Sequence, residues 1–196
     1  MLSVEETFGK GAKSYELEAK KHRYSAYGEV AKKLLKLLRP GSKILDIGVG
    51  TGLGSKIFIK SKYKVVGIDV SKEMLREASN YNYWKLYRMD FNKGLKFRRD
   101  GFDAVIMVAA LEFSKNPKKL LKNIFKVLKN GGLFAVTMPI KQKRRMKYFK
   151  TFEQEKFEKI LEKTGFRIRI SKRIFGWKLK EGKLYYRLYV TEKHEP

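Results

Sequence analysis

Short apolar runs alternate with longer amphipathic segments through the middle of the chain. Runs typical of buried strands lie at 44–47, 64–68, 84–89, 104–108 and 133–138. Segments with apolar residues at helical spacing lie at 53–60, 72–80 and 117–128. Strands that alternate with helices favour an α/β fold with a doubly wound, mostly parallel sheet. The stretch 92–101 is short and basic, so we expect no helix between the third and fourth strands.

The two ends of the chain carry other patterns. Apolar residues recur at helical spacing over 26–38 and stop at Arg39-Pro40-Gly41, which predicts an N-terminal helix. Near the C-terminus we expect a helix over 152–164, ended by Gly165. Two strands, over 166–177 and 183–191, should then form an antiparallel hairpin with one buried and one solvent-exposed face.

These patterns predict one domain over 1–196, because a chain of 196 residues can bury a single core of ordinary size. Its parts would be an N-terminal helical cap over 1–40, a core over 41–138, and a loop, helix and closing hairpin over 139–196. The five strands of the core and the two of the hairpin make a seven-stranded sheet.

The most informative stretch is 44–54, where an apolar run ends in Asp46 and glycines follow at 48, 50 and 52. Glycines allow a sharp turn and let a ligand approach the main chain. A second apolar run ends in Asp69. Strand, glycine turn, helix and a strand tipped with an acid are typical of the nucleoside-binding half of a doubly wound fold. An ordinary strand-to-helix turn is the alternative, but it explains neither the three glycines nor the two acids.

The glycine spacing distinguishes between nucleosides. A dinucleotide fingerprint beginning at Gly48 would need its third glycine where the chain has Leu53. The pattern D-x-G-x-G-x-G instead resembles motif I of the class I S-adenosylmethionine-dependent methyltransferases, which have a Rossmann-like fold. The resemblance implies that the glycine loop contacts the methionine moiety, and that Asp69 accepts hydrogen bonds from both ribose hydroxyls.

Further positions match this family, most closely its ubiquinone/menaquinone-biosynthesis type. The resemblance implies that Asp90 holds the adenine amino group and that Phe91 lies against the ring. The full set of implied cofactor-binding residues is Tyr15, Asp46, Gly48, Val49, Gly50, Gly52, Asp69, Val70, Met74, Asp90, Phe91 and Val108. From the residues alone, Asp90 could be a turn residue, Tyr15 an amphipathic contact and Met74 a core residue.

No catalytic residue is assigned, because methyl transfer from a sulfonium depends mainly on alignment of nucleophile, methyl group and sulfur. Candidates for a base or an orienting group are Glu112, Tyr15, His22 and Tyr24. The chain departs from the family pattern in having Glu16 where the family has Asp. It also has Phe113 where the family often has His, which removes one candidate for substrate handling.

Composition narrows the chemistry. The chain has no cysteine and only two histidines, so thiolate and His-rich metal sites and a cysteine nucleophile are excluded, and we expect no metal. Absence of cysteine fits a cytoplasmic protein. The start of the chain lacks a secretory pattern, and no apolar run reaches the ~18 residues that a membrane helix needs.

The charge bears on the acceptor. The chain carries 46 basic and 20 acidic residues, a formal net charge of +26, and residues 141–150 hold six positive charges without an acid. Such a field attracts RNA or another polyanion, although a lysine-rich composition alone could produce it. We expect methyl transfer to an N or O nucleophile of a small molecule. The alternatives are an RNA acceptor, and behind it a protein acceptor or a non-catalytic cofactor-binding regulator.

Overall fold

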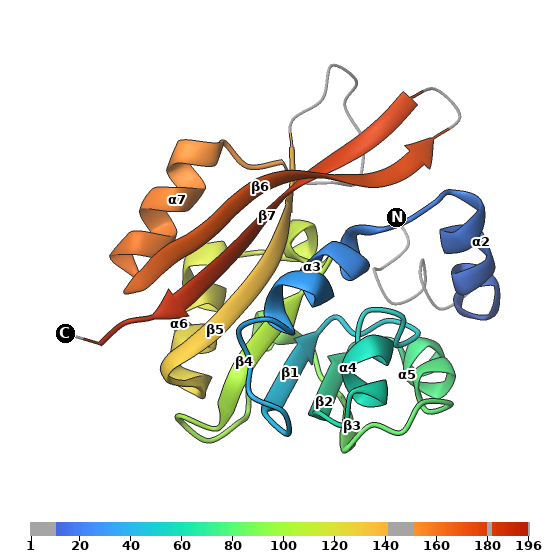
Figure 1. The fold of residues 1–196 in the computed structure, drawn as a ribbon, viewed down its shortest axis with the longest axis horizontal. Helices are drawn as coiled ribbons and strands as arrows, with labels where there is room; N and C mark the ends of the chain where they lie inside the picture. Colours follow the sequence, from blue (N-terminus) through green and yellow to red (C-terminus); the bar gives the residue numbers. More distant parts are fainter. Residues whose placement is uncertain (1–10, 141–150, 180–181, 196) are drawn as a thin grey trace.

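A computed structural model describes residues 11–140, 151–179 and 182–195. Its centre is a seven-stranded sheet with the order β3-β2-β1-β4-β5-β7-β6 (Figure 1). The parallel strands are β1 (Lys43–Ile47), β2 (Lys64–Asp69), β3 (Lys85–Arg88), β4 (Phe102–Met107) and β5 (Leu128–Pro139). The last two, β6 (Phe166–Leu179) and β7 (Gly182–Lys193), form an antiparallel hairpin whose β7 pairs with β5. The predicted doubly wound, Rossmann-like fold with a closing hairpin is confirmed.

Helices cover both faces of the sheet. One face packs against α2 (Tyr15–Lys21), α3 (Ala26–Leu34) and α4 (Lys56–Lys60), and the other against α6 (Pro117–Val127) and α7 (Gln154–Lys163). A short α5 (Lys72–Ala78) lies near β2 and β3. Three 3₁₀ turns complete the elements, namely η1 (Ala12–Ser14), η2 (Phe91–Lys93) and η3 (Leu111–Phe113). Apolar residues from both faces of the strands enter the core, as expected when helices flank a parallel sheet.

The topology brings distant parts of the chain together at one end of the sheet. The long β6–β7 hairpin reaches across toward α2 (Figure 1). There the backbone N–H of Lys178 donates to the carbonyl oxygen of His22 at 2.8 Å. This bond ties the N-terminal helices to the hairpin and places both beside the carboxyl ends of the parallel strands.

Several predicted boundaries were wrong, each for a local reason. The helix predicted over 26–38 ends at Leu34, because a tighter bond from the Leu37 N–H to the Leu34 carbonyl turns the chain toward β1. The helix predicted from 53 begins at Lys56, since the preceding residues form turns. The fifth strand begins at Leu128 rather than 133, and its pairing to β4 is irregular between Leu128 and Leu133.

The hairpin was expected to have one exposed face, and this holds only in part: Leu184, Tyr186 and Leu188 are buried while Tyr185 and Arg187 between them are partly exposed, but the alternation ends there. Tyr189 was predicted on the exposed side of β7 but is fully buried. Its ring lies 5.5 Å from that of Phe157, and its hydroxyl donates to Glu158 at 3.0 Å. Helix α7 therefore covers this part of the second face. The expected absence of an α-helix over 92–101 holds, because the stretch contains only part of η2 and irregular chain.

Candidate functional site

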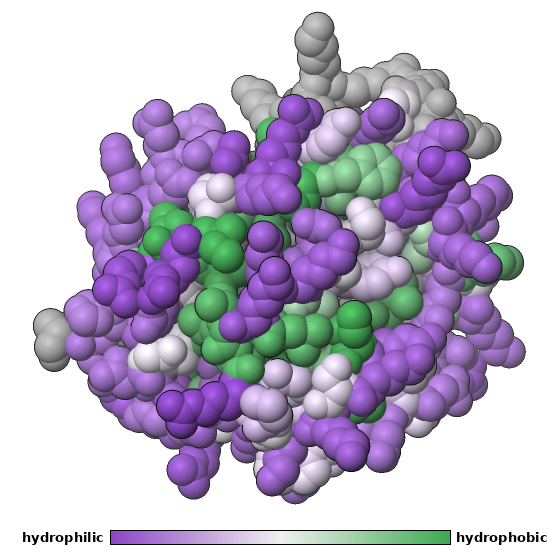
Figure 2. All heavy atoms as spheres, viewed as in Figure 1, coloured by the Kyte–Doolittle hydropathy of each residue, from purple (hydrophilic) through white to green (hydrophobic). Residues whose placement is uncertain are grey.

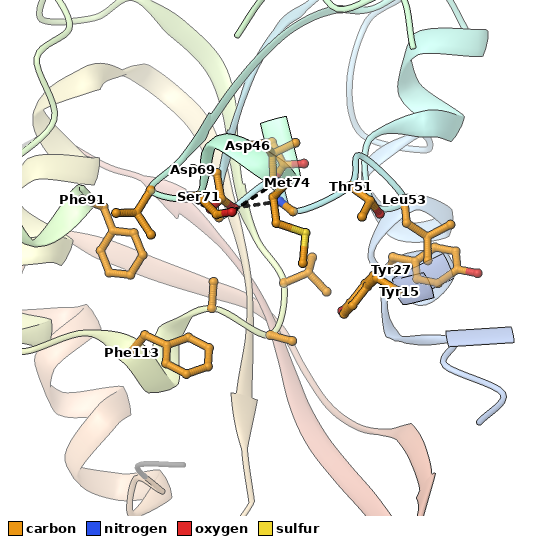
Figure 3. Close-up of a pocket in the computed structure, with 18 of the residues that line it drawn as sticks. Tyr15, Tyr27, Asp46, Thr51, Leu53, Asp69, Ser71, Met74, Phe91 and Phe113 are labelled. Carbon is orange, nitrogen blue, oxygen red and sulfur yellow. Dashed lines mark hydrogen bonds between the residues drawn. The ribbon is translucent and has the colours of Figure 1, made fainter. Parts of the chain in front are cut away.

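A pocket of about 500 Å³ opens at the carboxyl ends of β1, β2 and β4, where doubly wound sheets bind ligands (Figure 3). It is lined by Tyr15, Tyr24, Tyr27, Asp46, Gly48, Val49, Gly50, Thr51, Leu53, Gly54, Asp69, Val70, Ser71, Met74, Asp90, Phe91, Asn92, Val108, Ala109, Ala110, Phe113 and Lys115. All the predicted cofactor-binding residues except Gly52 are in this lining. Residues far apart in the sequence thus meet at one place.

Asp69 stands at the end of β2 with its carboxylate held on both sides. Its Oδ2 accepts the backbone N–H of Gly50 at 2.9 Å, and its Oδ1 accepts the N–H of Ser71 at 3.0 Å. Figure 3 draws both bonds as dashed lines. Because each carboxylate oxygen can accept two bonds, the same group can still accept hydroxyl groups from a ligand. The Ser71 hydroxyl in turn accepts the Met74 N–H and starts α5.

The glycine loop has a backbone conformation that residues with a side chain would adopt only with strain. Gly48 and Gly50 have φ of +74° and +55°, and a Cβ at Gly48 would lie 2.7 Å from the Cβ of Ala110. Gly52 also has positive φ, at +94°, but it faces the Tyr81 ring, which a Cβ would approach to 2.8 Å. Gly52 was predicted to contact the cofactor, whereas the structure places it outside the pocket lining. Gly48 and Gly52 therefore allow close side-chain packing, whereas Gly50, where a Cβ would meet nothing within 4 Å, leaves space beside the main chain.

Asp46 is buried beneath the loop. Its Oδ2 accepts the Ser55 hydroxyl hydrogen at 2.5 Å. Burial raises the pKa of Asp46 to about 7; the nearby Asp69 charge also raises it, while the Ser55 bond lowers it. A carboxyl group in this position anchors the turn and presents its remaining edge to the pocket.

One end of the pocket is apolar, with Phe91 and Phe113 on the side away from Tyr15 and Tyr27 (Figure 3). Asp90 lines this part and uses its Oδ1 to accept the Asn92 N–H at 2.9 Å, so it is a turn residue and a pocket residue at once. Met74 is 2% exposed and likewise serves both as core and as pocket wall.

Aromatic side chains line the pocket's other end. We call Tyr15, Tyr24, Tyr27 and Trp177 the aromatic wall, since the first three line the pocket and Trp177 contacts two of them. Tyr24 stacks on Trp177 with ring centroids 4.4 Å apart, while Tyr15 meets the same indole edge-on at 6.1 Å. Tyr27 was missed in the sequence, although it lies three residues after Tyr24 and meets its ring at 5.5 Å. Trp177 was missed because only folding brings it there.

The four candidates for acid–base chemistry differ in their position and burial. His22 is not in the pocket lining, and its Nδ1 lies 2.5 Å from the Lys178 carbonyl oxygen and its Nε2 3.3 Å from Glu18. Burial raises the pKa of both Tyr15 and Tyr24 above the usual value for tyrosine, so both remain protonated at neutral pH. Glu112 is 2% exposed, and burial raises its pKa to about 7.

Other features of the described residues set limits on the site. They contain no group of three His, Asp or Glu side chains placed to hold a metal ion. No helix among them is long and apolar enough to cross a membrane.

Asp103, at the start of β4, accepts the Lys43 N–H at 2.7 Å and the Lys129 ammonium at 2.6 Å, so it supports the far end of the sheet. The basic segment 141–150 lies outside the described residues.

Comparison with known proteins supports this geometry. Residues 45–136 match the family model described as a methyltransferase domain. A demethylmenaquinone methyltransferase of Tropheryma whipplei is 35% identical over 102 residues, 49% of this chain and 41% of that protein. An 18S rRNA (guanine(1575)-N(7))-methyltransferase of Saccharomyces cerevisiae is 35% identical over 111 residues, 50% of this chain and 40% of that protein. The chain thus spans less than half the length of these relatives.

The fold has close counterparts among solved structures. One chain in the structure of a complex between the Haloferax volcanii Trm112 methyltransferase activator and its methyltransferase partner superposes with a TM-score of 0.78, over 99% of this chain and 99% of that chain, at 19% identity. At that identity the likeness concerns the fold.

Proposed function

We propose that this chain, which carries a class I S-adenosylmethionine-dependent methyltransferase domain, transfers the methyl group of that cofactor to an N or O nucleophile of a small molecule. The observation that carries this proposal is the juxtaposition of Asp69 and Gly50. The Asp69 carboxylate, at the end of β2, accepts the backbone N–H of Gly50 at 2.9 Å. A hydrogen-bond acceptor for the ribose and the exposed main chain of the glycine loop therefore lie side by side.

The pocket fits the cofactor in size and chemistry. Its volume of about 500 Å³ lies within the range of small-molecule sites. At Gly50 a Cβ would meet nothing within 4 Å, so the main chain there is open to a ligand, whereas Gly48 packs closely against Ala110. The Oγ1 of Thr51 is buried and has no hydrogen-bond partner among the described residues, although Thr51 lines the pocket. A ligand with polar atoms would supply that missing partner.

The chain's own residues then divide the work. Asp69 would hold the ribose, the loop from Gly48 to Gly50 the amino-acid tail, and Asp90 with Phe91 the adenine. When bound, the cofactor supplies a methyl group on a sulfonium, which is a good leaving group. The protein aligns the nucleophile with that methyl group and excludes water, and alignment alone can supply much of the rate. The aromatic wall would border the acceptor.

An RNA acceptor is the second candidate, and the charge of +26 is the observation that favours it. Hydrophilic side chains surround a more apolar centre on the face shown in Figure 2. One relative of similar identity is an rRNA methyltransferase. The expectation that residues 141–150 lie beside the acceptor stays a prediction. A protein acceptor and a non-catalytic regulator rank behind these two, and a cytoplasmic location is proposed with them.

One experiment separates these functions. The protein is incubated with tritiated S-adenosylmethionine and a cell lysate, which is then divided into metabolite, RNA and protein fractions. We expect label among the metabolites, and much less of it with the Asp69→Asn variant at the same cofactor concentration. Label confined to RNA, together with RNA binding that weakens steeply between low and moderate salt, would transfer the proposal to the second candidate. Calorimetry that detects no binding of S-adenosylhomocysteine would refute both.

A further inference from the structure

Glu112 lies in η3, in the segment that follows β4; it is not itself among the pocket-lining residues, but Ala110 and Phe113 on either side of it are. Its side chain is 2% exposed, and neither carboxylate oxygen has a hydrogen-bond partner among the described residues. A buried carboxyl group without a partner costs free energy, and such groups call for an explanation. Folding alone gives no reason for an acid here.

The surroundings of Glu112 connect it to the pocket. Burial is the main cause that raises the pKa of three tyrosines, and the charge of Glu112 raises it further; they are Tyr15 of α2, Tyr24 before α3 and Tyr186 of β7. Tyr15 and Tyr24 line the pocket, and Tyr15 also senses the charge of Asp69. Glu112 therefore acts on the same end of the pocket as the aromatic wall. Burial raises the pKa of Glu112, its own backbone N–H lowers it, and no charged neighbour among the described residues contributes.

A desolvated carboxylate beside aromatic rings has a characteristic ligand. The faces of tyrosine and tryptophan attract cations, and a buried carboxylate is stabilised when a cation pairs with it. An ammonium group satisfies both requirements, whereas a neutral hydroxyl group satisfies neither. The positive surface charge does not cancel this preference, because solvent ions screen exposed charges over about 8 to 10 Å.

We propose, on the premise of the function above, that the acceptor is a small amine and that Glu112 binds its ammonium group and removes a proton from it. The N–H bond breaks, the proton goes to the Glu112 carboxylate, and the freed lone pair forms the new N–CH₃ bond. The S–CH₃ bond breaks with its electron pair going to sulfur, which converts the sulfonium to a neutral thioether. The methylated amine carries the positive charge, and Glu112 passes its proton to solvent as product leaves.

This proton transfer should make the rate of methyl transfer depend on pH. A carboxyl group with a pKa of about 7 is ready to accept a proton near neutral pH. The rate at low amine concentration should therefore rise with pH through about 7 and then level off. A group that only supported the fold would leave no such inflection.

Binding is tested first, with 2-phenylethylammonium and 2-phenylethanol as matched probes on the protein saturated with S-adenosylhomocysteine. We expect the amine to bind at least tenfold more tightly than the alcohol at pH 7.5, and Glu112→Gln to abolish this preference. Glu158→Gln is the control, since that carboxylate belongs to α7 and is already bonded by Tyr189 and Gln154. It should leave the preference intact.

Turnover is tested next, with tritiated cofactor and a panel of primary amines and the corresponding alcohols. Label should enter amines, Glu112→Gln should lower kcat/KM at least 100-fold without changing cofactor affinity, and the inflection near pH 7 should disappear. Equal binding of amine and alcohol, or an unchanged pH profile in Glu112→Gln, would overturn the assignment. If S-adenosylhomocysteine binds but the amine shows no preference, only this inference fails. If S-adenosylhomocysteine does not bind, the proposed function fails.

Discussion

Replacing Glu112 by Gln should change the pH dependence of the stability of the protein. Below about pH 4.5 the glutamate is protonated in both the folded and the unfolded chain, so the two proteins should be similarly stable. Above that pH the unfolded chain ionises first, because burial raises the folded pKa to about 7. The contribution of Glu112 to wild-type stability must then fall as pH rises toward 7 and stay level above it. At about 1.4 kcal/mol per pH unit between the two pKa values, the loss is on the order of 3 kcal/mol.

Urea unfolding of both proteins at pH 5, 6, 7 and 8 measures this effect. The stability of Glu112→Gln relative to wild type should increase through the series and change little above pH 7. The raised pKa of Asp46 lies in the same window, but it is common to both proteins and cancels in the difference. A stability difference that stays constant from pH 5 to 8 would show that Glu112 is not a desolvated carboxyl group, and the reasoning on its role would lose its basis.

Two further predictions concern the cofactor site and its glycines. Asp69→Asn should weaken binding of S-adenosylhomocysteine about 10- to 100-fold in calorimetry, because a hydrogen bond to a charged acceptor contributes about 1.5 to 3 kcal/mol. Asp103→Asn, at the far end of the sheet, is the control. Equal affinities of the two variants would contradict the assignment. Gly48→Ala should lower both the melting temperature and that affinity, since its Cβ would meet Ala110 at 2.7 Å. Gly28→Ala in α3 has open space around its Cβ and should stabilise the protein by about 0.5 to 1 kcal/mol. Thermal melts of the two variants that shift in the same direction would refute the distinction.

Local signals in the sequence were sufficient for the framework of the fold. Apolar runs over 44–47 and 64–68, with helical periodicity between them, determined a parallel α/β core, because the two periods are set by backbone geometry. The spacing of Gly48 and Gly50 and the acid at 69 located the pocket, since positive φ and a carboxylate at a strand end are properties of single positions. The predicted boundaries of the elements were less accurate, because helix ends depend on where the chain must turn next, as at Leu34.

Tertiary structure decided which surfaces became interior and which distant residues meet. Tyr189 alternates as an exposed strand residue would, yet α7 covers it. Trp177 joins Tyr15 and Tyr24 only because the β6–β7 hairpin reaches the N-terminal helices. Four acid–base candidates looked alike along the chain, and burial selected Glu112 among them by removing its water without giving it a partner. Periodicity and residue spacing are local properties of the sequence, so the sequence determined the framework and the pocket. Desolvation of a side chain depends on the packing of the whole fold, so only the tertiary structure identified the buried carboxyl group beside the pocket.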